Sequence, residues 1–598
     1  MHKIYVSLLG MIVAHSTLAQ PSSHIAFEVS FKEPQAHYAE LSMEISGIKQ
    51  DYIDVKMPVW TPGSYLVREF AKSVEGFAAV GANGTPIKSY KINKNTWRLE
   101  SKKASLVKLT YRVYGFEVSV RTNFFDADGA FISPASTFMY VDGLIDHPAE
   151  VKVVPYNGWS QVSTGMEPVA GKPYTYYAPD FDILFDSPIE VGNQDIFSFE
   201  AAGVHYEVAM ARGGNYDKER LKTDMAKIVE SETAVFGENP NKRYLFIVHN
   251  NQSGGGGLEH LNSTVLGATR FGYGTEVGYQ GFLGLVAHEH FHLWNVKRLR
   301  PKALGPFNYD AENYTTSLWI AEGFTAYYDN LALRRSGFLG PEQYLNTLCG
   351  DVQAVENRPG HNVQSLADAS FDAWIKSYRP DENSANTGIS YYNKGALMAA
   401  MLDLSIIKAT DGQKHLDDVM KAMYAEYYKK EKRGYTDQEF IAMAEKVAGI
   451  SLAEIYEAVT TAGTPDYNKY LHYAGLELID ANEGLKQPYL GASTGLTEGR
   501  LLITTVTRES GAWVGGLNVK DELLAVNGVR LDAAGKELDR ILAASKVGDT
   551  IKVLVARDGL IKELTVTLGQ DPNKRYMIRP LQNLSEAQKT VMRKWLSL

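Results

Sequence analysis

The stretch LVAHEHFHLWNVKRLRP (residues 285–301) places three histidines and a glutamate within five positions. His288 and His292 are four residues apart, which on an α-helix puts both imidazoles on one face about one turn apart. That spacing suits two ligands of one zinc ion, and Glu289 lies where its carboxylate can take the proton of a metal-bound water. His290 points elsewhere on the helix, so we expect it to pack or to support the site.

The alternative, an ordinary solvated helix face, predicts no third ligand downstream, but SLWIAEGFTAYYDN (317–330) offers Glu322 among apolar residues. An unpaired carboxylate in such surroundings is costly, which favours a metal ligand over a surface residue. Two histidines and one glutamate leave the fourth zinc position open for water, as catalysis requires. We therefore predict one zinc ion per chain, bound by His288, His292 and Glu322. Asp329, on the same helix face as Glu322, either orients a ligand histidine or is a plain surface residue.

Composition limits the class of protein. The chain has 598 residues, of which 44% are hydrophobic, so we expect several packed domains rather than one core. A net charge of -9, a pI near 5.9 and the lack of any Lys/Arg block argue against nucleic acid as a partner. Cys349 is the single cysteine, which excludes an internal disulfide and a zinc site with several thiolates.

The first residues, MHKIYVSLLGMIVAHSTLAQ, have the features of a secretory signal peptide over 1–19: Lys3, an apolar run, and a small-residue cleavage site ending at Ala19. The apolar run is too short to span a bilayer, which needs about 20 residues. No later segment is long and apolar enough to cross a membrane. We therefore predict a secreted or periplasmic protein without a membrane span.

The pattern of the chain predicts a multidomain α+β fold. Short alternating runs such as HYAELSMEIS indicate an N-terminal antiparallel β-sandwich or saddle over 20–198. Longer amphipathic helices after a few strands indicate a catalytic domain over 199–475. A smaller β-rich domain with one helix is expected over 485–570, and NLSEAQKTVMRKWL predicts a helix in the tail, 571–598.

Three quoted segments carry a resemblance. HEHFHLWN (288–295) and WIAEGFTAYY (319–328) resemble the gluzincin zinc metallopeptidases. With the upstream PVWTPGSYLVREF (58–70) and a PDZ-like tail, the chain resembles specifically the glycyl aminopeptidase family. The resemblance runs over nearly the whole mature chain. It implies a thermolysin-like catalytic domain with a helical portion, and an aminopeptidase that removes N-terminal Gly or Ala from peptides with a free N-terminus.

Ahead of the zinc helix stands RYLFIVHNNQSGGGGLEH (243–260), which resembles the glycine-x-methionine-glutamate-asparagine segment of related aminopeptidases. The resemblance implies that Glu259 binds the α-ammonium of the substrate. Leucine and histidine replace the flanking methionine and asparagine, so only Glu259 carries over. Gly256 and Gly257 would let the backbone approach the bound peptide. The alternative is a flexible linker with an incidental glutamate.

ISYYNKGALMAAML (389–402) matches the tyrosine-x-lysine-glycine signature of the family. The match implies that Tyr392 donates a hydrogen bond to the oxyanion, a contribution of about 3 to 4 kcal/mol to transition-state stabilisation. Tyr391 is the alternative donor. In the resulting hypothesis Glu289 acts as the general base and then protonates the leaving amine.

PYLGASTG (488–495) and ESGAWVGGLNVKDELLAVNG (509–528) resemble a PDZ domain. Such a domain adds an extended peptide to its sheet edge and holds a terminal carboxylate on backbone N–H groups, here around Leu490, Gly491 and Ala492. A small β-barrel that only packs on the catalytic domain is the alternative. Whether a peptide ligand of this domain tethers or regulates is left open.

Two rival functions remain at this point. A zinc endopeptidase with the same three ligands would ignore whether the substrate amine is free. A non-catalytic protein would use the PDZ domain to bind peptides and keep the peptidase fold as a scaffold.

Overall fold

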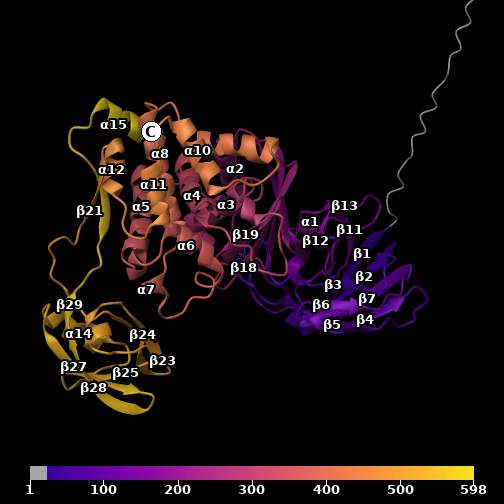
Figure 1. Cartoon of the computed structure of the whole chain (residues 1–598), viewed down its shortest axis with the longest axis horizontal. Coiled ribbons are helices and arrows are strands. Elements are labelled where there is room, and N and C mark those ends of the chain that lie inside the picture. The colour runs from indigo at the N-terminus through magenta and orange to yellow at the C-terminus, as the bar shows by residue number, and fades with distance from the viewer. Residues whose placement is uncertain (1–22) are drawn as a thin grey trace, which may run out of the picture.

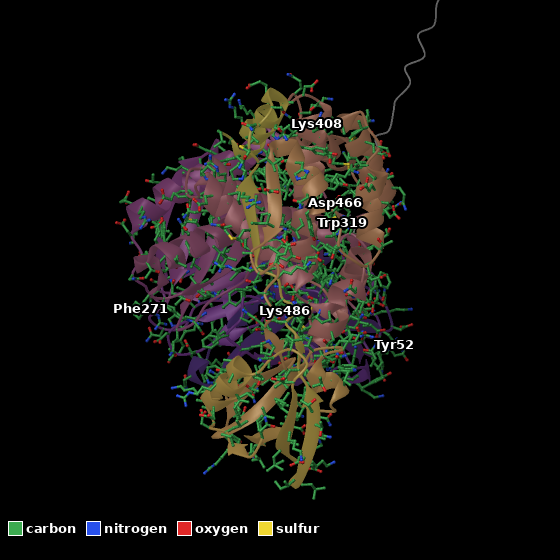
Figure 2. All side chains as sticks on the ribbon, turned by 90° about the vertical axis from the view of Figure 1, so that its left-hand side faces the viewer. Tyr52, Phe271, Trp319, Lys408, Asp466 and Lys486 are labelled. Carbon is green, nitrogen blue, oxygen red and sulfur yellow. The ribbon has the colours of Figure 1, made fainter. Side chains whose placement is uncertain are left out.

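The computed structural model describes residues 23–598, so the predicted signal peptide, 1–19, lies outside the described residues. Figure 1 shows a β-rich N-terminal part, a helical middle part and a small β-rich part, from which the chain returns to the helices at its C-terminal end. In Figure 2, Lys486 lies where the chain passes from the helical part to the small β-rich part. The arrangement confirms the predicted multidomain α+β class.

The N-terminal part holds three sheets. Burial alternates along strands such as Tyr38–Ser46, so one face of the large sheet packs on the core, as the alternating sequence predicts. Within the described residues the strands of these sheets pair antiparallel, except that His24–Ser30 pairs parallel to Ala149–Val154. The large sheet has the order β13 (Glu167–Pro168), β14 (Thr175–Ala178), β11 (Ala149–Val154), β1 (His24–Ser30), β2 (Tyr38–Ser46), β7 (Leu106–Tyr114), β4 (Val74–Gly81). The smaller sheets are β10 (Tyr140–Val141), β3 (Ile53–Lys56), β6 (Thr96–Leu99), β5 (Ser89–Asn93), and β12 (Gln161–Thr164), β15 (Ile189–Gly192), β9 (Ala130–Ile132), β8 (Phe124–Phe125).

A five-stranded sheet begins the middle part. Its order is β16 (Asp195–Ala201), β17 (Val204–Ala211), β18 (Arg243–Asn251), β20 (Ser263–Thr269), β19 (Gly257–Glu259). The three central strands are parallel, whereas β19 runs antiparallel to β20 at the edge of the sheet. The last glycine of the glycine-rich segment therefore begins an edge strand, one side of which is unpaired by the sheet.

Helices pack against this sheet and against each other around a large apolar core. The buried helix α8 (Tyr391–Ala409) lies at the centre of this core. Gly323, at the end of the turn η6 (Trp319–Gly323), and Gly395 of α8 let these two segments approach closely, because a Cβ on Gly323 would lie 2.5 Å from Cα of Gly395. The only cysteine, Cys349, is a buried free thiol. The helices are α2 (Lys218–Phe236), α3 (Glu276–Phe291), a π-helical turn η6 (Trp319–Gly323), α4 (Phe324–Arg335), α5 (Pro341–Glu356), α6 (Leu366–Phe371), α7 (Ser384–Thr387), α8 (Tyr391–Ala409), α9 (Leu416–Met423), η9 (Tyr424–Lys430), α10 (Asp437–Ala448), α11 (Ala453–Thr460) and α12 (Tyr467–Leu471).

The small β-rich part is inserted into the chain between two strands that pair with each other. β21 (Leu476–Asp480) leads into it, and β30 (Tyr576–Pro580) leads out of it and pairs with β21. Its sheet has the order β23 (Ala492–Thr497), β24 (Arg500–Val506), β25 (Glu522–Val526), β27 (Thr550–Arg557), β28 (Leu560–Thr567), with helices α13 (Gly511–Val514) and α14 (Lys536–Ala544). β23 and β28 are its edge strands.

The tail forms the predicted helix, α15 (Glu586–Leu596), which begins after the capping residue Ser585. Trp595 is buried, and its indole N–H donates to the hydroxyl of Tyr327 at 2.9 Å. The tail is therefore part of the helical core. None of the helices within residues 23–598 combines the length and the apolar character that crossing a bilayer requires.

Candidate metal centre

Helix α3 carries the two predicted histidine ligands at its C-terminal end. The hydroxyl of Thr275 caps the first turn by accepting from the N–H of Gly278. His288 and His292, one turn apart, present their Nε2 atoms 3.2 Å from each other. The spacing in the sequence therefore does bring both rings to one point.

Glu322 reaches the same point from the π-helical turn η6. Its Oε2 lies 3.2 Å from Nε2 of His292 and 3.6 Å from Nε2 of His288. A π-helical turn holds one residue more than an α-helical turn and is frequent at functional sites. Burial disfavours the charged carboxylate, but the neighbouring His292 and His288 outweigh burial and lower the pKa of Glu322 to about 2.

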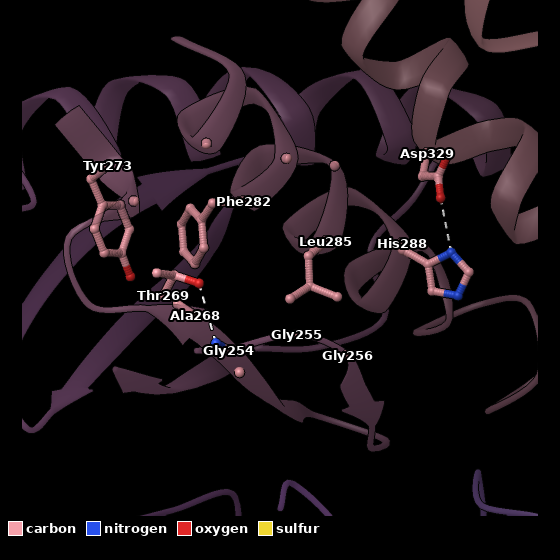
Figure 3. Close-up of a pocket in the computed structure, with 15 residues that line it drawn as sticks. Gly254, Gly255, Gly256, Ala268, Thr269, Tyr273, Phe282, Leu285, His288 and Asp329 are labelled. Atoms are coloured by element: carbon pink, nitrogen blue, oxygen red, sulfur yellow. Dashed lines mark hydrogen bonds and ion pairs between the residues drawn. The ribbon is translucent and has the colours of Figure 1, made fainter. Parts of the chain in front are cut away.

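These three donors fit a zinc ion. Nδ1 of His288 lies 2.9 Å from Oδ2 of Asp329 (Figure 3), and Nδ1 of His292 lies 2.8 Å from the carbonyl oxygen of Asn295. Each ring therefore donates its proton outward and turns the lone pair of Nε2 inward. Ligands at 2.0 to 2.1 Å from a tetrahedral zinc ion are about 3.3 Å apart, close to the separations found here. Without a cation, these lone pairs and the carboxylate would repel each other.

Asn295 connects the two ligand segments. Its side-chain amide donates to the carbonyl oxygens of Ile320 and Ala321 at 2.9 and 3.1 Å, and to the hydroxyl of Thr325 at 3.1 Å. One residue thus orients His292 through its backbone and anchors the turn of Glu322 through its side chain. Asn295 lies within the HEHFHLWN segment, but the sequence pattern alone predicts no role for it.

Glu289 lies beside the donors and is 4% exposed. Its Oε2 is buried and has no hydrogen-bond partner within the described residues. Burial, with the charges of Glu259 and Glu322, raises the pKa of Glu289 to about 7, although His288 and His292 act in the opposite direction. A carboxyl with this pKa is suited to accept and release a proton near neutral pH.

Glu259 faces Glu289 from the edge strand β19. One carboxylate oxygen of each and a ring nitrogen of His292 lie within 4.8 Å of one another. No donor within residues 23–598 forms a hydrogen bond or ion pair with the Glu259 carboxylate, so its negative charge is free to meet a cationic group. Glycine is required next to Glu289, because a Cβ on Gly257 would lie 2.4 Å from Cδ of Glu289. Gly256 has a φ of +72°, a left-handed conformation that favours glycine.

The two candidate tyrosines lie at the start of α8. The ring of Tyr392 stacks beside His288, with 6.0 Å between ring centroids. Tyr391 stacks on Tyr392 at 4.8 Å and is fully buried behind it. Burial, with the charge of Glu322, raises the pKa of both phenols, so each remains a hydrogen-bond donor. The geometry favours Tyr392 as the one that faces the donors.

Two other histidines of the motif segments lie elsewhere. Nδ1 of His290 is 2.6 Å from Oε2 of Glu232, and burial lowers the pKa of His290 to about 3. His260 lies 3.0 Å from Oδ1 of Asp186, which also pairs with Lys297 at 2.7 Å. Neither belongs to the cluster of donors, as expected for His290.

A cavity of about 440 Å³ extends along α3 from His288, which alone among the three donors lines it. Figure 3 shows His288 and Asp329 at one end and the segment Gly254–Gly256 along one side, with Phe282 and Leu285 projecting from the helix. Glycines line much of this cavity, so backbone rather than side chains forms its walls. Such a wall allows an extended peptide to lie against the protein.

Comparisons with known proteins agree with these features. A family model described as M61 glycyl aminopeptidase matches residues 281–398, and models of the peptidase M61 N-terminal domain and of a PDZ domain match 26–193 and 488–568. An aminopeptidase N family protein from Idiomarina loihiensis, known from its crystal structure, is 30% identical, with 96% of this chain and 100% of that chain covered and a TM-score of 0.88. The chain belongs to the M61 glycyl aminopeptidase family.

An M1 zinc metallopeptidase from Deinococcus radiodurans is also similar, at 13% identity, with 74% of this chain and 95% of that chain covered and a TM-score of 0.48. Among curated proteins no match was found. The family membership and the PDZ domain predicted from the motifs are confirmed. The family is one of peptidases.

The PDZ domain of this family member places its predicted carboxylate-binding loop before the edge strand β23. Gly491 has a φ of +79°, and its carbonyl oxygen accepts from the N–H of Thr507 at 2.8 Å. Within residues 23–598 the N–H groups of Leu490 and Gly491 donate to no protein acceptor, while Ala492 begins β23. The loop therefore offers backbone donors beside an unpaired strand edge.

The N-terminal domain contributes residues that the sequence analysis did not assign to the site. A Cβ on Gly63 would lie 2.6 Å from both carboxylate oxygens of Glu259. Tyr65 is buried, and burial together with the charges of Glu322 and Glu259 raises its pKa. Gly63 and Tyr65 belong to PVWTPGSYLVREF, the segment that resembles the family. No local pattern in it indicates that this loop contacts residues about two hundred positions later.

Proposed function

We propose that this peptidase is a zinc-dependent aminopeptidase that hydrolyses the N-terminal residue of peptides. The observation that carries the proposal is the convergence of Nε2 of His288, Nε2 of His292 and Oε2 of Glu322 at one point, with all three atoms within 4.8 Å of one another. Histidines anchored through Nδ1 and a buried carboxylate form the donor set expected of a catalytic zinc site.

When bound there, zinc polarises the scissile carbonyl and acidifies a water molecule. Glu289 takes up the proton of the attacking water, because its carboxylate has a free oxygen and a pKa near 7. It then passes the proton to the leaving amine. The lack of any protein donor on Oε2 of Glu289 supports this role.

Two further side chains position the reacting peptide. The unpartnered carboxylate of Glu259 holds the free α-ammonium, so that cleavage falls after the first residue. The phenol of Tyr392 donates to the developing oxyanion of the carbonyl. Tyr391, buried behind it, supports its ring. The arrangement favours an exopeptidase over an endopeptidase, since an internal peptide bond brings no ammonium to Glu259.

We also propose that the enzyme prefers Gly or Ala as the first residue, as its family implies, and that it is secreted or periplasmic, as the predicted signal peptide indicates. Loop 490–492 and the edge of β23 would bind the C-terminus of a peptide ligand. Gly63 leaves little space beside Glu259, in keeping with a small first side chain.

The test compares Gly- or Ala-p-nitroanilide with the acetylated form of the same substrate. We expect turnover of the free amine, loss of turnover on acetylation, and inactivation by a chelator that zinc reverses. Equal cleavage of both forms would support the endopeptidase alternative. No cleavage of either form by the zinc-loaded protein, together with binding of C-terminal peptides, would support the non-catalytic PDZ alternative.

A further inference from the structure

One arginine of the N-terminal domain, Arg121, reaches the edge strand β19, and a second, Arg68, lies near it. Nη2 of Arg121 donates to the carbonyl oxygen of Gly257 at 3.0 Å. A Cβ on Gly256 would lie 3.7 Å from Nη1 of the same guanidinium. Arg68 lies close by, held through Nη1 to the hydroxyl of Ser64 at 2.8 Å. Arg121 therefore contacts Gly257, the residue that itself touches Glu289, and Arg68 lies near enough for the charge of Arg121 to act on it.

Neither guanidinium has an acidic partner. No ion pair of Arg68 or Arg121 occurs among residues 23–598, and Nε of Arg121 is buried without a hydrogen-bond acceptor. Burial and the charge of Arg121 lower the pKa of Arg68, while the exposed Glu117 and the phenol of Tyr378 act weakly in the other direction. Two partly buried positive charges that act on each other are costly unless an anion compensates them.

The position of this pair matches one end of a short bound peptide. A substrate held with its ammonium at Glu259 and its scissile bond near Glu289 runs antiparallel to β19, from Glu259 towards Gly257 and Gly256. Each extended residue advances the chain by about 3.3 Å. The carboxylate of a dipeptide or tripeptide therefore falls opposite Gly257 or Gly256, where the guanidinium of Arg121 lies.

We propose that Arg68 and Arg121 form a subsite for the C-terminal carboxylate of the substrate, so that the preferred substrates are dipeptides and tripeptides with both ends free. This inference rests on the proposed aminopeptidase function. The catalytic domain would recognise the ammonium through Glu259, and the N-terminal domain would recognise the carboxylate. The guanidinium fork matches a carboxylate in geometry and charge.

The test uses the zinc-loaded full chain and the substrates Ala-Ala-Ala and Ala-Ala-Ala amide, which differ only in the terminal charge. For the unaltered protein we expect kcat/KM to be at least about tenfold higher for the free acid, the size expected for hydrogen bonds between charged groups. Arg121→Gln and Arg68→Gln should each lower kcat/KM for the acid far more than for the amide. Arg121→Lys should keep part of the preference.

Arg112→Gln is the matched control, because Arg112 is an exposed arginine of the same domain that pairs with Glu75. It should keep the full preference for the acid. Equal losses on acid and amide in the Arg68 and Arg121 variants would overturn the proposal and assign both arginines to holding β19. Absence of any acid preference in the unaltered protein would also overturn it, whereas failure to cleave Ala-p-nitroanilide would instead overturn the proposed function.

Discussion

The candidate metal centre and the PDZ loop are both proposed to bind part of a peptide, but they are built differently. The centre gathers buried side chains from α3, η6 and β19, and His288 and His292 are each anchored through Nδ1 by a further residue. The PDZ loop offers backbone N–H groups beside an open strand edge. The amide of Asn386 donates to the carbonyl oxygen of Val506, and its Oδ1 accepts from the N–H of Arg508, both at 2.8 Å, so one side chain links α7 to this domain.

Because of this difference, we expect substitutions to affect the function of the two sites differently. In the metal centre the chemistry resides in individual side chains, so the loss of one atom matters. In the PDZ loop the chemistry resides in the backbone, so only a change that alters the backbone conformation matters. The predictions below test this contrast.

The largest effect is expected for Glu289→Gln. The amide keeps the shape of the side chain but cannot accept the proton, so kcat should fall by about 10²- to 10⁴-fold. Steady-state kinetics on Ala-p-nitroanilide measure the loss, and metal analysis should find zinc still bound. Retained activity would refute the role of Glu289, and loss of zinc would mean that the carboxylate acts as a ligand.

Tyr392→Phe should have the next largest effect. Removing one oxyanion donor lowers kcat by about 10²- to 10³-fold. Tyr391→Phe is the matched control, because it removes a hydroxyl one position away that does not face His288, and it should lower kcat much less. The opposite order of the two variants would assign the donor role to Tyr391.

Asp329→Asn should weaken the metal site without removing a ligand. Asp329 orients His288, and loss of such a partner lowers metal affinity by about 10- to 100-fold. Competition with a zinc chelator measures the change. Asp372→Asn, an exchange of the same kind in the pair between Asp372 and Lys376, should leave the affinity unchanged. Unaltered affinity in Asp329→Asn would show that Asp329 is dispensable for the site.

The smallest effect on catalysis is expected for Gly491→Ala. A Cβ there would lie 2.0 Å from Cβ of Ser510 at a φ of +79°, so the PDZ loop must distort, at a cost of about 1 to 3 kcal/mol. Binding of a C-terminal peptide should weaken, while kcat/KM for Ala-p-nitroanilide stays the same. Gly499→Ala has a similar φ of +78° but open space around it, so it should bind the peptide normally. A fall in kcat/KM would show that the two sites are coupled.

Much of the fold followed from local patterns. Alternating strands, amphipathic helices and the tail helix were predicted, but the parallel pairing of β1 with β11 was not, because alternation does not distinguish the direction of a partner strand. The return of the tail into the helical core was also missed. An amphipathic helix shows that it has an apolar face, but not which surface covers that face.

The sequence by itself determined that His288, Glu289 and His292 share a helix end, because the period of an α-helix sets which side chains lie on one face. The sequence also predicted Glu322 as the third ligand. Only the tertiary structure decided that Glu322 lies on a π-helical turn, that Asp329 contacts His288 rather than solvent alone, and that Asn295 holds His292. It also decided that Gly63 and Arg121 reach β19 from another domain. These contacts join segments far apart in the chain. They depend on how helices, strands and domains pack against each other, which the spacing of residues within one segment does not predict.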